Sequence, residues 1–122
     1  ANTQIILVDD SKDGSDFRQD NEKILTSSLR ENDKYVKTKG EVGAPEARNL
    51  GAKEASGKYI AFLDADVALS TNWLETVKAQ LEFDDATALV SAMQINSNDA
   101  PPLERIRTAL SNADLDTEVT MQ

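Results

Sequence analysis

Short apolar runs alternate with helical patterns along this chain, and that alternation limits the folds it can adopt. Three continuous apolar runs are typical of strands buried on both faces: "QIILV" (4–8), "KYIAFL" (58–63) and "ALVSAMQI" (88–95). "KYVKTK" (34–39) predicts a shorter strand, and its lysines suit a sheet edge. Strands separated by helices predict an α/β fold with three layers, a mostly parallel sheet between flanking helices. We expect a single domain over residues 1–122.

The expected helices have recognisable ends. Ser15 suits the N-cap of a helix from Asp16 to about Leu29, in which Phe17, Ile24 and Leu25 recur at helical spacing and are predicted to face the core. A second helix has Pro45 in its first turn, Gly57 as its stop, and a small-residue face: Ala47, Leu50, Gly51 and Ala55. Ser70 or Thr71 is expected to cap a third, whose core face holds Trp73 or Leu74, Val77 and Leu81. Leu103, Ile106 and Leu110 predict a last helix.

Composition removes several kinds of chemistry. The chain has no cysteine and no histidine, which excludes disulfides, zinc–thiolate sites, Ser-His-Asp triads and imidazole bases. The net charge of −9 argues against binding to a nucleic-acid backbone. Any site must therefore use carboxylates, hydroxyls, amides, lysine or arginine.

Two pairs of acids end two of the predicted strands. Asp9 and Asp10 follow the first, and Asp64 and Asp66 follow the run at 58–63. In open parallel sheets, ligands bind beyond the carboxyl ends of the strands, so both pairs are expected at one rim if the strands run the same way. Carboxylates gathered there repel one another unless a cation or hydrogen-bond donors lie among them. Hard oxygen ligands favour Mg²⁺ or Mn²⁺, which commonly share their coordination with phosphates.

A structural interpretation of the same residues stands beside this one. An aspartate at the end of a strand is a common turn former and helix cap, and an Asp-x-Asp triplet alone is weak support for a metal site. Arg48 and Asn49 on an exposed helix face are expected, on this interpretation, only to be solvated.

Longer motifs carry a family resemblance. "IILVDDSKDGS", followed about thirty residues later by "GAPEARNLGAKEASGKYIAFLDADV", resembles the nucleotide-sugar-binding half of the inverting family 2 glycosyltransferases, which have the Rossmann-like GT-A fold. The resemblance spans roughly residues 4 to 83. It implies a metal-dependent enzyme that transfers a sugar from a UDP- or GDP-linked donor to an acceptor, with this chain as the donor-binding part.

The resemblance also implies roles for individual residues. Asp9 and Asp10 resemble the acidic pair that contacts the base and ribose, and Arg48 and Asn49 match an "ARN" element near the nucleotide. Asp64 would meet the ribose and diphosphate. Asp66, with Asp64, would bind the Mn²⁺ or Mg²⁺ that bridges the phosphates in the DXD motif.

The chain departs from the family pattern in several places. Val67 stands where many relatives have another acid, and the family's first strand, its acceptor-binding half and its general base are not matched; "NADLDTE" (112–118) does not fit the base motif. We therefore expect an incomplete GT-A domain, inactive alone, whose unpaired strands are filled by direct pairing, by "TEVTM" (117–121) or by a second copy. The resemblance implies a cytoplasmic location, with membrane association only through segments outside this sequence. The alternative is a non-catalytic domain that binds nucleotides or acts as an acidic α/β interaction module.

Overall fold

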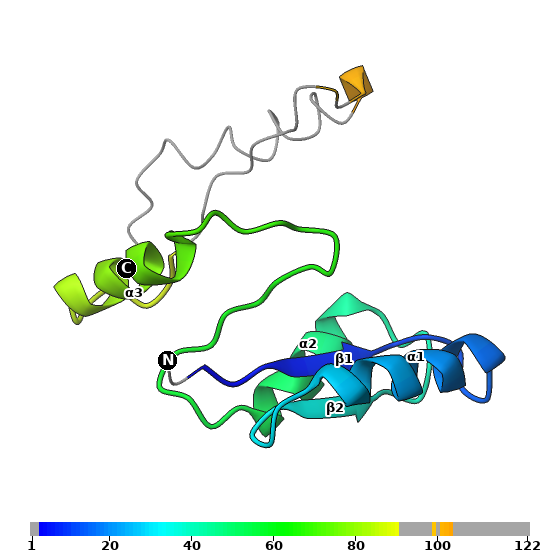
Figure 1. Cartoon of the computed structure of the whole chain (residues 1–122). Helices are drawn as coiled ribbons and strands as arrows, with labels where there is room; N and C mark the ends of the chain where they lie inside the picture. Colours follow the sequence, from blue (N-terminus) through cyan, green and yellow to red (C-terminus); the bar gives the residue numbers. More distant parts are fainter. Residues whose placement is uncertain (1–2, 91–98, 100, 104–122) are drawn as a thin grey trace. The chain divides into compact units, whose positions relative to one another are not determined.

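The computed structural model describes residues 3–90, 99 and 101–103. Its contacts divide the chain into two units, residues 1–67 and 68–122, which are described separately. Among the residues that the structure describes, the first unit contains β1 (Ile6–Asp9), β2 (Lys34–Lys37), α1 (Asp16–Ser28) and α2 (Ala44–Glu54), and the second contains α3 (Trp73–Phe83) (Figure 1). The expectation of one domain over 1–122 stays a prediction. No helix in the described part of the chain is both long and apolar enough to cross a membrane.

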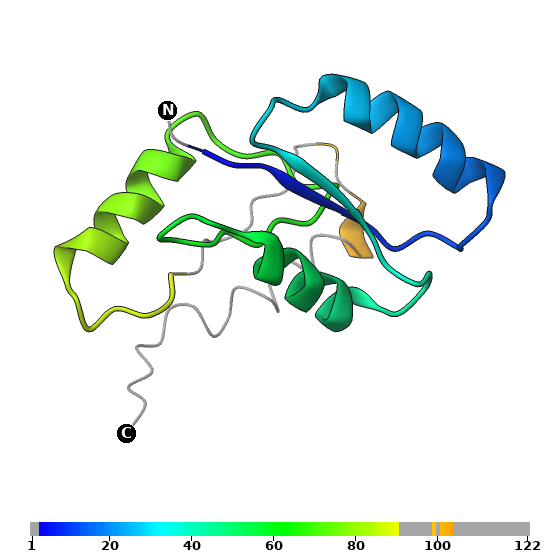
Figure 2. The same cartoon turned by 90° about the horizontal axis from the view of Figure 1, so that it is seen from below.

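A parallel pair of strands forms the centre of the first unit. Strand β1 (Ile6–Asp9) lies beside β2 (Lys34–Lys37), with Ile6 opposite Lys34 and Asp9 opposite Lys37. Figure 2 shows the two strands between helices α1 (Asp16–Ser28) and α2 (Ala44–Glu54). The predicted α/β class, with a parallel sheet between helices, is confirmed for an incomplete sheet.

Helix α1 begins where the sequence predicts but turns a different face inward. The Ser15 Oγ accepts a hydrogen bond from the Arg18 amide at 3.1 Å, which confirms the N-cap. Phe17 and Ile24 are 67% and 65% exposed, so their predicted place in the core is wrong. Arg18 is buried instead, and Leu25 is half-buried on the same side. Arg18 faces inward because its guanidinium donates to the backbone oxygens of Asp9 and Thr38, and the Phe17 ring has no donor for them.

Helix α2 packs against β1 through a glycine. Pro45 lies in its first turn, as predicted, but the helix ends at Glu54, before the expected stop at Gly57. Gly51 is buried, and a Cβ built on it would lie 2.8 Å from the Val8 Cγ2 atom. The absence of a side chain at this position therefore sets how closely α2 approaches the sheet.

Two predictions about strands are wrong. Residues 58–63 form no strand, and Ile60, Phe62 and Leu63 are 49%, 55% and 51% exposed. Strand β1 is half-buried along its length rather than buried on both faces. Both results have one cause: a strand needs a neighbour to satisfy its peptide groups, and within the described residues β1 has a neighbour on one edge only.

The second unit contains α3 (Trp73–Phe83). Trp73, Val77 and Leu81 are half-buried on one side of this helix, as the periodicity predicts, whereas Leu74 is exposed. Asn72 occupies the N-cap position without a side-chain hydrogen bond, so the predicted cap at Ser70 or Thr71 is wrong.

Several predictions fall partly or wholly outside the described residues. They concern the strand at 88–95, of which only 88–90 are described and carry no strand, the last helix after Leu103, and the segments 112–118 and 117–121.

Replacing Gly51 by valine should destabilise the chain. Because valine is not a poorer helix former than glycine, helix propensity predicts no destabilisation. A lower free energy of unfolding, by about 1–3 kcal/mol, would therefore come from the clash with Val8. Urea unfolding followed by circular dichroism measures it, with Lys53→Val on the exposed side of α2 as the matched control. Equal stability of the two variants would contradict the close packing described here.

Candidate functional site

Asp9 ends β1 with its carboxylate held by neighbouring donors. Its Oδ1 accepts hydrogen bonds from the Ser11 amide at 2.9 Å and the Ser11 hydroxyl at 2.6 Å, and its Oδ2 accepts one from the Tyr35 hydroxyl. Partial burial would raise the pKa of Asp9, but the Ser11 and Tyr35 hydrogen bonds and the nearby Arg18 charge outweigh it, so the pKa is lowered. Burial and the bond to Asp9 raise the pKa of Tyr35 to about 12.

Asp10 organises the loop between β2 and α2. Its Oδ1 accepts from the Thr38 hydroxyl at 2.5 Å and the Val42 amide at 2.9 Å, and its Oδ2 accepts from the Gly43 amide at 2.9 Å. These donors, Thr38 first, lower the pKa of Asp10. Gly43 has a φ of 97°, which a residue with a side chain rarely adopts, so the loop depends on this glycine to present its amide. The carboxylate thus fixes the backbone that leads into α2.

Arg18 joins the carboxyl ends of both strands. One guanidinium nitrogen donates to the backbone oxygens of Asp9 at 2.9 Å and Thr38 at 2.7 Å, and the other donates to Asp13 at 3.0 Å. Arg18 is only 4% exposed, whereas the Asp13 side chain is 77% exposed, so the ion pair lies at the surface end of a buried cation. Arg18 was not among the residues predicted from the sequence, although its spacing to Leu25 and Leu29 places it on the inward side of α1.

The structure brings two of the predicted site residues into contact. An Arg48 guanidinium nitrogen of α2 lies 2.8 Å from the Asp64 Oδ1, with both side chains exposed by about half. Asp66 follows in a turn closed by a hydrogen bond from the Val67 amide to the Asp64 carbonyl at 3.2 Å. Its carboxylate makes no hydrogen bond or ion pair with residues that the structure describes. The "DAD" segment is thus attached to α2 rather than to the sheet.

The two acidic pairs do not form one cluster. Among the described residues, no group of three or more aspartates and glutamates is placed to hold a metal ion. The convergence expected at the rim required 58–63 to be a strand parallel to β1, which it is not. The nucleotide and metal roles of Asp9, Asp10, Arg48, Asn49, Asp64 and Asp66 stay predictions.

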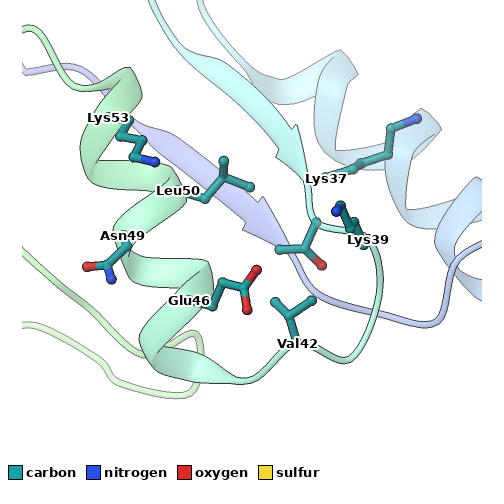
Figure 3. A pocket seen from close by; sticks show the side chains of 8 residues that line it. Lys37, Lys39, Val42, Glu46, Asn49, Leu50 and Lys53 are labelled. Atoms are coloured by element: carbon teal, nitrogen blue, oxygen red, sulfur yellow. The ribbon is translucent and has the colours of Figure 1, made fainter.

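Asn49 lies apart from Arg48. It lines a pocket of about 400 Å³ between α2 and the end of β2, together with Lys37, Thr38, Lys39, Val42, Glu46, Leu50 and Lys53 (Figure 3). Figure 3 shows Leu50 and Glu46 pointing from α2 toward this space, while Lys37 points away from it. Lys37 instead pairs with Glu22 at 3.1 Å. Arg48 and Asn49, which are consecutive in the "ARN" element, therefore point to different sides of α2.

Comparison with known proteins identifies the family. The sequence profile of glycosyl transferase family 2 matches residues 1–118, nearly the whole chain. The chain belongs to glycosyl transferase family 2. No solved structure matches it significantly.

Curated relatives of this family 2 chain are transferases from animals and bacteria. The probable N-acetylgalactosaminyltransferase 7 of Caenorhabditis elegans is 35% identical over 65% of the chain and 13% of its own length. The polypeptide N-acetylgalactosaminyltransferase 11 of Xenopus tropicalis is 29% identical over 79% of the chain and 16% of its own length. The glycosyltransferase GlyG of Streptococcus pneumoniae is 30% identical over 73% and 29%. The chain thus spans less than a third of the length of each.

Replacing Arg18 by methionine should strongly destabilise the chain. Methionine keeps much of the apolar volume but leaves the Thr38 carbonyl without its donor, and a buried group left unsatisfied costs about 1–3 kcal/mol. Thermal unfolding checks this, with Lys23→Met on the exposed side of α1 as the control. A similar melting temperature for both variants would show that the buried guanidinium contributes little.

The lowered pKa of Asp10 predicts a pH dependence of stability. Because the pKa of Asp10 is lowered in the folded state, its carboxylate stabilises the fold at pH values above 3.8, the ordinary pKa of an aspartate. This stabilisation is lost as the pH falls through the folded-state pKa. Asp10→Asn should therefore be less stable than the parent at pH 7, and the difference should shrink below pH 3.8. Urea unfolding between pH 7 and 3 measures the difference. Asp20→Asn on exposed α1 is the control, and a pH-independent difference for Asp10→Asn would refute the prediction.

Proposed function

We propose that this chain is the donor-binding part of a metal-dependent, inverting glycosyltransferase that uses a nucleotide-diphosphate sugar. Membership of family 2 supports sugar transfer as the reaction class. The observation that carries the proposal is the ion pair between Arg48 and Asp64, because it joins the "ARN" helix to the "DAD" segment without help from the sheet. Two motifs whose paired residues lie 16 positions apart in the sequence thereby come within reach of one ligand.

Asp9 and Asp10 are proposed to contact the base and ribose. Each carboxylate accepts three hydrogen bonds from the protein, which leaves about one of its four acceptor positions for a ligand donor. Their internal bonds hold them at fixed orientations, so a ribose hydroxyl or base N–H would meet an acceptor that is already positioned. Both residues lie at the carboxyl end of β1, the edge where parallel sheets bind ligands.

Asp66 and Asp64 are proposed to hold Mn²⁺ or Mg²⁺. Their oxygens are hard ligands, and these ions need only one or two carboxylates when phosphates and water complete the coordination, so the donor set fits. Asp66 is exposed and Asp64 has one oxygen on Arg48, which leaves ligand atoms on both. A divalent ion bound there would stabilise the charge that grows on the departing diphosphate.

Arg48 has two proposed tasks. Its guanidinium positions Asp64 in the free chain, and its remaining N–H groups are donors suited to phosphate oxygens. The sugar's anomeric carbon would be attacked by an acceptor while the nucleoside diphosphate leaves. Inversion at that carbon requires a carboxylate base, and we assign none within this chain.

The names of the relatives suggest which donor to test first. Several are N-acetylgalactosaminyltransferases, so we propose N-acetylgalactosamine as the first sugar and the UDP- and GDP-linked forms as the donors to compare. A cytoplasmic location is likewise a proposal, drawn from the family resemblance alone.

A second candidate is a non-catalytic domain. The observation that favours it is the engagement of Asp9 and Asp10 by internal donors, which is what structural turn formers do. Such a domain would bind a nucleotide without metal dependence, or bind none.

Nucleotide with metal should raise the melting temperature, and Asp66→Asn should abolish most of that rise. Saturation at about 100 times the dissociation constant adds roughly 2.7 kcal/mol of stability. Thermal unfolding with UDP or GDP and Mn²⁺ measures the effect, and Asp16→Asn, at the start of α1, is the control. If Asp66→Asn and Asp16→Asn reduce the ligand-induced rise in melting temperature equally, Asp66 has no metal role. If neither nucleotide raises the melting temperature of the parent, the non-catalytic interaction domain is favoured.

A further inference from the structure

The two carboxylate oxygens of Asp9 differ in what they can still accept. Oδ1 accepts hydrogen bonds from the Ser11 amide at 2.9 Å and the Ser11 hydroxyl at 2.6 Å, whereas Oδ2 accepts one from the Tyr35 hydroxyl. A carboxylate has about four acceptor positions, two on each oxygen. Counted against the described residues, Oδ1 is filled, and the position left for a ligand lies on Oδ2, the oxygen that Tyr35 holds.

The register of the sheet brings Tyr35 to this carboxylate. Tyr35 of β2 lies opposite Leu7 of β1, and Asp9 follows Leu7 by two residues, so the three side chains are on one side of the sheet. The hydroxyl reaches across the strand pair to the end of β1. Both Tyr35 and Asp9 are half-buried, which leaves part of each side chain accessible to a ligand.

Tyr35 supplies a constraint that Ser11 does not. The Ser11 amide closes the turn after β1 by bonding to the aspartate two residues before it, and this turn uses Oδ1 alone. The last torsion of an aspartate side chain is broad, so Oδ2 would still swing if Oδ1 were the only oxygen held. A donor on Oδ2 fixes the plane of the carboxylate, which spares a ligand the cost of ordering it.

Asp9 also stays an acceptor at neutral pH. Burial alone would raise the pKa of Asp9, but the hydrogen bonds from Ser11 and Tyr35 and the charge of Arg18 lower it. An ionised carboxylate only accepts hydrogen bonds, so Oδ2 suits an N–H or O–H group of a ligand and does not suit a phosphate oxygen.

We propose that Tyr35 is a positioning residue for nucleotide binding, because its hydroxyl fixes the Asp9 oxygen that still has an acceptor position. The ligand's donor is a ribose hydroxyl or a base N–H, and the proposal rests on the nucleotide-binding role proposed above for Asp9. Tyr35 acts through Asp9, so its effect on affinity exists only while Asp9 is present. A tyrosine that merely stabilised the sheet would matter equally without it.

Calorimetric titration of the whole chain with UDP and with GDP, each with Mn²⁺, tests this dependence. Tyr35→Phe keeps the ring and removes the hydroxyl, so we expect it to weaken binding of the tighter nucleotide by about five- to tenfold. In a chain that carries Asp9→Ala, the same change should weaken binding further by less than about twofold. Tyr59→Phe is the matched control, because Tyr59 is the chain's other tyrosine and its ring contacts Lys58 rather than Asp9.

A fluorine label gives a second measurement, which keeps the hydroxyl and stays decisive if Tyr35→Phe does not fold. In the Tyr59→Phe chain, meta-fluorotyrosine is incorporated only at position 35. Its fluorine resonance should move when nucleotide saturates the chain, because the ligand's donor joins the hydroxyl at Oδ2. With Asp9→Ala added, the resonance should move much less. Circular dichroism confirms that each variant is folded at the temperature used.

Failure of this proposal and failure of the proposed function give different results. If the parent binds neither nucleotide, both fail together. If the parent binds but Asp9→Ala leaves the affinity unchanged, Tyr35 has no contact to position, while nucleotide binding by the chain stands. Tyr35 is only structural if Tyr35→Phe matches Tyr59→Phe, if it weakens binding equally with and without Asp9, or if nucleotide leaves the fluorine resonance in place.

Discussion

The buried guanidinium of Arg18 is the interaction on which the rest of the first unit depends. Two strands of four residues offer few ladder bonds, and their carboxyl ends would otherwise separate. Arg18 donates to a carbonyl at the end of each strand, so α1 fixes both at once. The loops that leave these ends carry Asp10 and lead into α2, and their positions follow from that one side chain.

Local signals predicted the helices well because caps and periodicity lie within the segments themselves. Ser15, Pro45 and the spacing of Trp73 and Val77 were sufficient for α1, α2 and α3. The strand at 58–63 was wrong because an apolar run becomes a strand only beside a partner, which periodicity does not supply. Hydrophobicity likewise favoured Phe17 for the core. Arg18 is buried instead because it donates to the carbonyls of Asp9 and Thr38, and the sequence of α1 carries no information about those acceptors.

In the candidate site, too, local motifs could be predicted from the sequence, whereas contacts between segments could not. Motif spacing singled out Arg48 and Asp64 separately but did not predict the ion pair between them. It gave no sign that Thr38 and Tyr35 would hold the two acids at the end of β1, because those contacts depend on the register between the strands. The structure therefore separates Asp9 and Asp10, which several hydrogen bonds hold, from Asp64 and Asp66, whose segment is attached within the described residues by the surface ion pair of Asp64 with Arg48.

That attachment has a thermodynamic consequence. A ligand that binds both Asp64 and Asp66 must also fix a stretch of backbone that is outside the sheet formed by the described strands, at about 1–2 kcal/mol for each residue ordered. For the nucleotide-sugar donor proposed above, the gain from phosphate contacts would be reduced by that amount, so ordering of residues 58–63 beforehand would tighten binding without any contact to the ligand. Under the proposed function, the affinity for the donor would then depend on how far residues 58–63 are ordered before it binds.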